Sequence, residues 1–140
     1  MSWLNLQGKH VLVIGAGSFG WAVALEFIHE GSKVSLVDQN ELLLSDLQQN
    51  DSSGLLKTIV CDVTSYDECL TSVSYAQDQF GAIDVFIYAV GINPRKPIED
   101  ISLNDWDSVM QVNLRSCFWL AQIVGEGMKK SGGGRMVFFS

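Results

Sequence analysis

Three glycines near the N-terminus have the spacing of a loop that binds the phosphates of a dinucleotide. The segment VLVIGAGSFG places Gly15, Gly17 and Gly20 in a G-x-G-x-x-G pattern directly after an apolar run. The first glycine permits a tight turn, the second leaves room for a pyrophosphate, and the third lets a helix pack closely on a strand. A helical pattern follows, and the free N–H groups at its start, near Ser18 and Phe19, attract phosphate. The pattern therefore predicts a nucleotide site.

A carboxylate ends the next predicted strand, whose sequence is KVSLVD with Asp38 as its last residue. A carboxylate at this place accepts hydrogen bonds from the ribose hydroxyls and repels a 2′-phosphate, which favours NAD over NADP. Two alternatives stay open at this stage. Asp38 could be a solvated turn residue, and the glycine pattern also serves FAD proteins, which makes flavin a weaker alternative cofactor.

Composition excludes several classes of partner. The chain has 140 residues, of which 47% are hydrophobic and 18% charged, with a formal net charge of −7. Such a chain is globular, and its negative charge argues against nucleic acid or an anionic membrane as a partner. No segment approaches the roughly 20 consecutive apolar residues of a membrane span, and the first residues do not resemble a signal peptide.

Cysteine and histidine usage predicts no metal site. Cys61, Cys69 and Cys117 are odd in number and lack the spacing of metal ligands, and His10 and His29 lie far apart in the sequence. We expect reduced, partly buried thiols and a cytoplasmic protein.

Strand-like and helix-like patterns alternate along the chain, which is typical of an α/β sheet covered by helices on both faces. The predicted strands are Lys9–Ile14, Lys33–Val37, Leu56–Cys61, Val85–Ala89 and Arg135–Phe139. The predicted helices are Phe19–Glu30, Glu41–Gln49, Tyr66–Phe80 and Leu103–Lys129. Right-handed crossovers then give a Rossmann-type, doubly wound parallel sheet of strand order 3-2-1-4-5, and a dinucleotide crevice between the first and fourth strands. We expect residues 1–140 to form one domain.

Local signals mark where the helices begin and end. The segments that start at Ser65 and Ser102 resemble capping boxes, although the second has an Asp where Glu or Gln is usual. Gly31, Gly81 and Gly132 fall where the end of a helix needs a left-handed residue.

Further motifs extend over essentially the whole chain, and their joint order is specific. They are Cys61-Asp62-Val63-Thr64, Phe80-Gly81-Ala82-Ile83-Asp84-Val85, Gly91-Ile92-Asn93-Pro94, the run from Trp106 to Leu114, and Gly134-Arg135-Met136-Val137. Together they resemble the N-terminal half of a short-chain dehydrogenase/reductase. The resemblance implies hydride transfer between NAD(H) and an alcohol or carbonyl substrate, which nothing in these residues identifies.

The resemblance also implies roles for particular residues. Asp62 would bond the adenine amino group with support from the Val63 backbone, and Ala89 and Gly91 would lie along the cofactor. Asn113 would support catalysis, because its helix carbonyl would help to hold a proton-relay water. The residues themselves favour another interpretation, in which Asn113 lies on an apolar stripe and tethers the helix to a neighbouring strand through a buried partner.

The chain departs from the family pattern at two places outside the catalytic residues. The glycine turn is one residue shorter than usual, so the phosphate loop is expected to sit differently. The Asn-Asn-Ala-Gly of the family is replaced by Tyr88-Ala89-Val90-Gly91. Both asparagine side chains that brace the sheet are missing, and we expect packing to stabilise that corner instead.

The catalytic Ser and Tyr-x-x-x-Lys that the family pattern implies would follow Ser140. None of Tyr66, Tyr75 and Tyr88 is followed by a lysine at the required spacing, and Ser140 itself lies one residue early. We therefore expect a nucleotide-binding half of an NAD-dependent oxidoreductase. The alternatives are a catalytically inactive module that senses or sequesters NAD, and a self-associating fragment that binds nothing.

Two segments predict self-association. The strand Arg135–Phe139 would form an exposed apolar edge. The helix Leu103–Lys129 would, by the resemblance, pack against its equivalent in another subunit. We expect a homo-oligomer.

Overall fold

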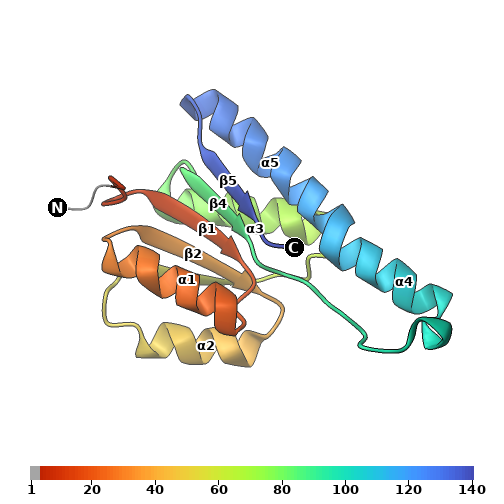
Figure 1. The fold of residues 1–140 in the computed structure, drawn as a ribbon. Helices are drawn as coiled ribbons and strands as arrows, with labels where there is room; N and C mark the ends of the chain where they lie inside the picture. The colour runs from red at the N-terminus through yellow and green to blue at the C-terminus, as the bar shows by residue number, and fades with distance from the viewer. Residues whose placement is uncertain (1–3) are drawn as a thin grey trace.

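Residues 4–140 are described by a computed structural model, in which one parallel sheet lies between two layers of helices (Figure 1). The strands are β1 His10–Ile14, β2 Lys33–Asp38, β3 Leu56–Val60, β4 Val85–Tyr88 and β5 Arg135–Phe138. The helices are α1 Ser18–His29, α2 Glu41–Asn50, α3 Tyr66–Phe80, α4 Leu103–Met110 and α5 Ser116–Ser131. A 3-10 turn, η1 Ile98–Asp100, precedes α4, and a π-helical turn, η2 Gln111–Arg115, joins α4 to α5.

The strand order is β3-β2-β1-β4-β5, and each pair of neighbours is parallel. This confirms the predicted Rossmann-type topology. The order reverses between β1 and β4, so the chain leaves these two strands in opposite directions and opens a crevice at their carboxyl ends.

Successive side chains of the central strands belong to two different hydrophobic cores, one on each face of the sheet. Leu12 and Ile14 of β1 face α3 and α5, whereas Val11 and Val13 of the same strand face α1 and α2. Figure 1 shows the same division, with α1 and α2 on one face of the sheet and α3, α4 and α5 on the other. Because successive side chains of a strand point to opposite faces, both faces must be apolar, and β1 is buried along its whole length.

The element boundaries agree with the sequence prediction to within one residue, except for the long helix after residue 102. The sequence predicts one helix over Leu103–Lys129, but the π turn at residues 111–115 interrupts it and α5 continues to Ser131. Such turns are common at functional sites. The periodicity of apolar residues does not reveal a π turn, because the extra residue in that turn shifts the helical pattern over only one turn.

The predicted caps are correct at one helix and half correct at another. Ser102 and Asp105 form the complete reciprocal capping box of α4. The Ser65 side chain caps α3 by accepting from the Glu68 N–H, but the Ser65 N–H donates to the Asp62 carbonyl. The Glu68 carboxylate therefore bonds a different group, which belongs to the site described below.

The outer edge of β3 is covered by a side chain rather than by a strand. The Gln48 amide of α2 donates to the Leu56 carbonyl at 3.1 Å and accepts from the Thr58 N–H at 3.0 Å. A side-chain amide carries the same donor and acceptor as a peptide unit, so Gln48 takes the place of one residue of a further strand. This contact protects an edge that would otherwise be free to pair with another chain.

We predict that Gln48→Ala lowers the free energy of unfolding by about 1 kcal/mol, the usual net value of such hydrogen bonds, and increases self-association. Urea unfolding and light scattering measure the two effects. The control is Gln49→Ala, because the neighbouring Gln49 side chain is exposed and bonds only Ser45 of its own helix in the described chain. Equal behaviour of the two variants would show that Gln48 does not protect the edge.

Candidate functional site

The glycine loop lies where the carboxyl ends of β1, β2 and β4 meet. Gly15 has a φ of +103°, and its N–H donates to the Val37 carbonyl at 2.7 Å. A Cβ on Gly15 would lie 2.8 Å from the Ala89 carbonyl oxygen, and a Cβ on Gly20 would overlap the carbonyl of Gly15. Both positions therefore require glycine. Gly15 has a positive φ and lies too close to Ala89 for a side chain, and Gly20 allows α1 to pack closely on the loop.

The space beside Gly17 is open. A Cβ built on this residue meets no atom within 4 Å, and its φ of −61° is accessible to any residue. Gly17 is also the N-cap of α1, which has no side-chain cap and no acidic residue in its first turn. By contrast, the side chains of Asn40, Ser65 and Ser102 cap the helices α2, α3 and α4. Within the described residues, the first N–H groups of α1 thus have no side-chain cap, and the space beside their N-cap residue is open, as an anion site requires.

Ser18 and Phe19, the first two residues of α1, are both exposed. The Phe19 ring packs edge-to-face on Phe139, with the ring centroids 4.5 Å apart. This contact orients the Phe19 side chain toward the end of β5. What Phe19 offers to an anion is therefore its backbone N–H.

Asp38, at the end of β2, is half-buried and fixed by two backbone donors. Its Oδ2 accepts from the Ala16 N–H at 2.8 Å and its Oδ1 from the Asn40 N–H at 2.9 Å. An ionised carboxylate has about four acceptor positions, so each oxygen keeps capacity for one further donor. The carboxylate thus supports the glycine loop and retains acceptor capacity on both oxygens.

A crevice of about 110 Å³ opens beside Asp38. Its lining comes from the carboxyl ends of β2, β3 and β4 and from the π turn: Val37, Asp38, Gln39, Cys61, Asp62, Val63, Thr64, Val90, Ile92 and Val112. The structure therefore brings together three of the predicted cofactor residues, Asp38, Asp62 and Val63, at the carboxyl ends of β2 and β3.

The segment after β3 is held by its own side chains and by α3. The Asp62 Oδ1 accepts from the Thr64 N–H at 2.9 Å and from the Thr64 hydroxyl at 2.8 Å. The Asp62 N–H donates to the Glu68 carboxylate at 2.8 Å. Val63 is buried, and its carbonyl accepts from the Cys69 thiol. The backbone of this segment is thus fixed before any ligand is bound.

Asn113 is exposed, so the expectation that it lies buried on the apolar stripe is wrong. Its side-chain oxygen accepts from the Ile92 N–H at 2.8 Å, and its amide donates to the Ile92 carbonyl at 3.0 Å. This pair of bonds tethers the π turn to the segment after β4. Gly91 is also exposed, and a Cβ there would lie 3.8 Å from the Asn113 side chain, so the two meet at one edge of the crevice.

Tyr88 corrects the expectation that packing alone stabilises the corner without the two asparagines. This buried residue donates from its hydroxyl to the Val112 carbonyl, and the Ser116 hydroxyl lies 2.6 Å from its oxygen. Burial raises the pKa of Tyr88 to about 12, so the phenol keeps its proton and remains a donor. A buried tyrosine hydroxyl needs a partner, and that rule could have predicted a hydrogen bond at this corner.

Glu68 and Gln111 are the site residues that sequence reasoning missed. Glu68 accepts from the Asp62 N–H, and the Gln111 side chain donates to the Thr64 carbonyl at 3.2 Å. The sequence pattern that starts at Ser65 predicts a capping-box role for Glu68 instead. The hydrogen bond from Gln111 to Thr64 joins segments far apart in the sequence, and no local sequence pattern predicts it.

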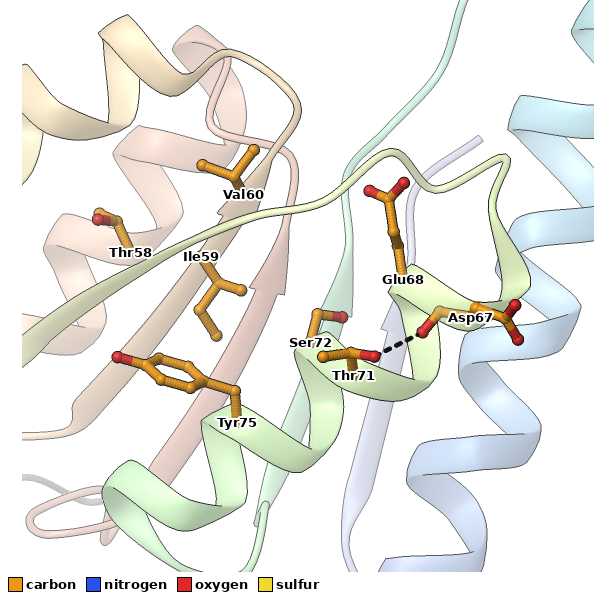
Figure 2. A pocket seen from close by; sticks show the side chains of 8 residues that line it. All are labelled: Thr58, Ile59, Val60, Asp67, Glu68, Thr71, Ser72 and Tyr75. Carbon is orange, nitrogen blue, oxygen red and sulfur yellow. Dashed lines mark hydrogen bonds between the residues drawn. The ribbon is translucent and has the colours of Figure 1, made fainter.

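A second hollow, of about 420 Å³, lies between the β3 edge and α3 and is shown in Figure 2. Its lining is Thr58, Ile59, Val60, Asp67, Glu68, Thr71, Ser72 and Tyr75. It contains none of the predicted cofactor residues. In residues 4–140 no group of three metal-ligating side chains is found, and no helix there is long and apolar enough to span a membrane.

Comparison with known proteins agrees with this geometry. The sequence pattern described as short chain dehydrogenase matches residues 9–140. D-threitol dehydrogenase of Mycolicibacterium smegmatis is 34% identical over 138 residues, which cover 95% of this chain and 52% of that protein. Gluconate 5-dehydrogenase of Gluconobacter oxydans is 33% identical over 136 residues, which cover 95% of this chain and 53% of that protein.

Among solved structures, that of NAD+-bound xylitol dehydrogenase matches with a TM-score of 0.90 and 30% identity, covering 96% of this chain and 53% of that one. The chain thus spans about half the length of the relatives it matches. Fold and sequence together define the class of protein: this chain belongs to the short chain dehydrogenase family.

Proposed function

We propose that this chain binds a dinucleotide, NAD in preference to NADP, across the carboxyl ends of the central strands. The observation that carries the proposal is the start of α1, which has no side-chain cap and opens onto free space at Gly17. Together with the helix dipole, these unpaired N–H groups favour a pyrophosphate. The NAD+-bound relative has the same fold over this region.

The crevice divides into parts that suit the parts of NAD. We assign Asp38 to the ribose hydroxyls, and Asp62 with Val63 to the adenine. Ser18 and Phe19 offer backbone N–H groups to the pyrophosphate, and Ala89 and Gly91 lie on the far side of the glycine loop from β2. All the residues to which we assign the adenosine and the pyrophosphate thus lie in this chain.

The reaction we propose for this family member is hydride transfer between NAD(H) and an alcohol or carbonyl substrate, because its relatives are named as dehydrogenases of polyols or a sugar acid. NAD supplies the hydride chemistry when bound. The residues of this chain bind and orient the nucleotide, and the helix carbonyl of Asn113 supports proton transfer. The Tyr-x-x-x-Lys pair does not occur in these 140 residues. What we propose for the chain itself is therefore the nucleotide-binding step.

The first prediction concerns Gly17→Val, which fills the space proposed for the pyrophosphate. Calorimetric titration with NADH should show saturable binding to the parent chain and a loss of at least about tenfold in affinity for the variant. The fold should survive, because the position is open and its φ is ordinary. Ala22→Val, at an exposed position on the same helix, is the control. Undiminished binding by a folded Gly17→Val chain would rule out the phosphate assignment.

The second prediction concerns cofactor choice. Asp38→Asn removes the negative charge but keeps an oxygen that accepts a backbone hydrogen bond, so the loop stays anchored. The ratio of NADH to NADPH affinity should fall by about tenfold, which corresponds to about 1.4 kcal/mol. Asp78→Asn, at an exposed site on α3, controls for the change in net charge. If the ratio is the same in both variants, Asp38 does not select the cofactor.

The third prediction is a dimer or a larger homo-oligomer. Four large apolar residues of the α4–η2–α5 helix are more than half exposed, with values of 86% for Leu103, 59% for Trp106, 57% for Leu114 and 57% for Phe118. Phe118→Glu should shift the mass measured by light scattering toward the monomer, because a buried charge opposes association. Leu42→Glu, on the opposite layer of the fold, should not. A monomeric parent chain would contradict this expectation.

A further inference from the structure

The segment Asp62–Thr64 is held in place by contacts from two separate elements. From the first turn of α3, Glu68 accepts the Asp62 N–H at 2.8 Å, and Figure 2 shows its side chain pointing toward the connection between β3 and α3. From the π turn, Gln111 donates to the Thr64 carbonyl at 3.2 Å. Glu68 and Gln111 therefore bond the first and the last residue of this segment.

The Asp62 side chain is oriented as a consequence. Its Oδ1 is occupied by the backbone and hydroxyl of Thr64, while its Oδ2 has no hydrogen-bond partner in the described residues. Asp62 also lines the crevice. A carboxylate with one oxygen fixed and the other unengaged is a directed acceptor, and its direction depends on the backbone that Glu68 and Gln111 hold.

Gln111 links this segment to the other side of the crevice. The π turn that carries it is fixed at Val112 by the Tyr88 hydroxyl of β4, and at Asn113 by the backbone of Ile92. Because Val112 and Ile92 line the same crevice, movement of the π turn would move both walls together.

We infer that Glu68 and Gln111 are positioning residues, which aim the Asp62 carboxylate at the exocyclic amino group of adenine and so make the site selective for a 6-aminopurine. This inference rests on the proposed nucleotide function. The chemistry is specific, because a carboxylate accepts a hydrogen bond from an amino group and repels a carbonyl oxygen at the same place.

The test compares NAD+ with nicotinamide hypoxanthine dinucleotide, which has a carbonyl oxygen where NAD+ has the adenine amino group. Calorimetric titration of the parent chain should show a preference of about tenfold or more for NAD+, as expected for a hydrogen bond to a charged group. Glu68→Ala and Gln111→Ala should each reduce this preference to about threefold or less. A merely structural role would weaken the binding of both nucleotides equally and leave their ratio unchanged.

Two further variants sharpen the comparison. Glu68→Gln should keep the preference, because its amide oxygen still accepts the Asp62 N–H. Asp67→Ala, in the same turn of α3, makes the same change of charge as Glu68→Ala, and the Asp67 side chain makes no hydrogen bond within residues 4–140. Asp67→Ala should therefore behave like the parent. Urea unfolding checks that each variant is folded, and Gln111→Ala keeps the test decisive if Glu68→Ala does not fold.

The outcomes separate the inference from the function on which it rests. A parent chain that binds no NAD+ would overturn the proposed function. A parent chain that binds both nucleotides equally would overturn the adenine role of Asp62 and with it the inference. The parent chain could instead prefer NAD+, with Glu68→Ala and Gln111→Ala keeping this preference as fully as Asp67→Ala does. That result would overturn the inference and leave the proposed function standing.

Discussion

The contact between Gly15 and the Ala89 carbonyl fixes where three strands of the sheet end. The Gly15 N–H bonds β2, the Ala89 N–H donates to the Ile14 carbonyl, and the place of a Gly15 side chain is taken by Ala89. Gly20 in turn lets α1 lie directly on this loop. The close approach of the Gly15 backbone to the Ala89 backbone, which a methyl group on Gly15 would prevent, therefore sets the direction of the α1 N-terminus. The proposed anion site depends on that direction.

The π turn supplies the second constraint, because it gathers hydrogen bonds from parts of the chain that are far apart in sequence. Gln111 reaches the segment after β3, Asn113 reaches the segment after β4, and Val112 receives the Tyr88 hydroxyl. A π turn exposes backbone carbonyls that a regular helix would satisfy internally, so it needs partners of this kind. In this chain, the Tyr88 hydroxyl provides one such partner from β4.

The two edges of the sheet have different surfaces. At β3, the Gln48 amide satisfies an outward carbonyl and an outward N–H, which leaves little for another strand to pair with. At β5, Val137 and Phe138 are exposed. The helix α5 runs beside β5 (Figure 1). The β3 edge is therefore a poor template for strand pairing, and the association proposed above is expected at the long helix, where buried apolar area would drive it.

The sheet order, the glycine loop and the strand-end positions of Asp38 and Asp62 can be predicted from the sequence, because apolar periodicity, glycine spacing and crossover handedness are local or nearly local rules. The sequence also predicts the capping box at Ser102, which involves neighbours in the chain. Three features could not be predicted in this way: Glu68 bonds Asp62 instead of completing a cap, Gln111 bonds Thr64, and Asn113 is exposed rather than buried. Those contacts depend on how α3, the π turn and the strand ends come together in space, and a pattern read along one element carries no information about the distance to another.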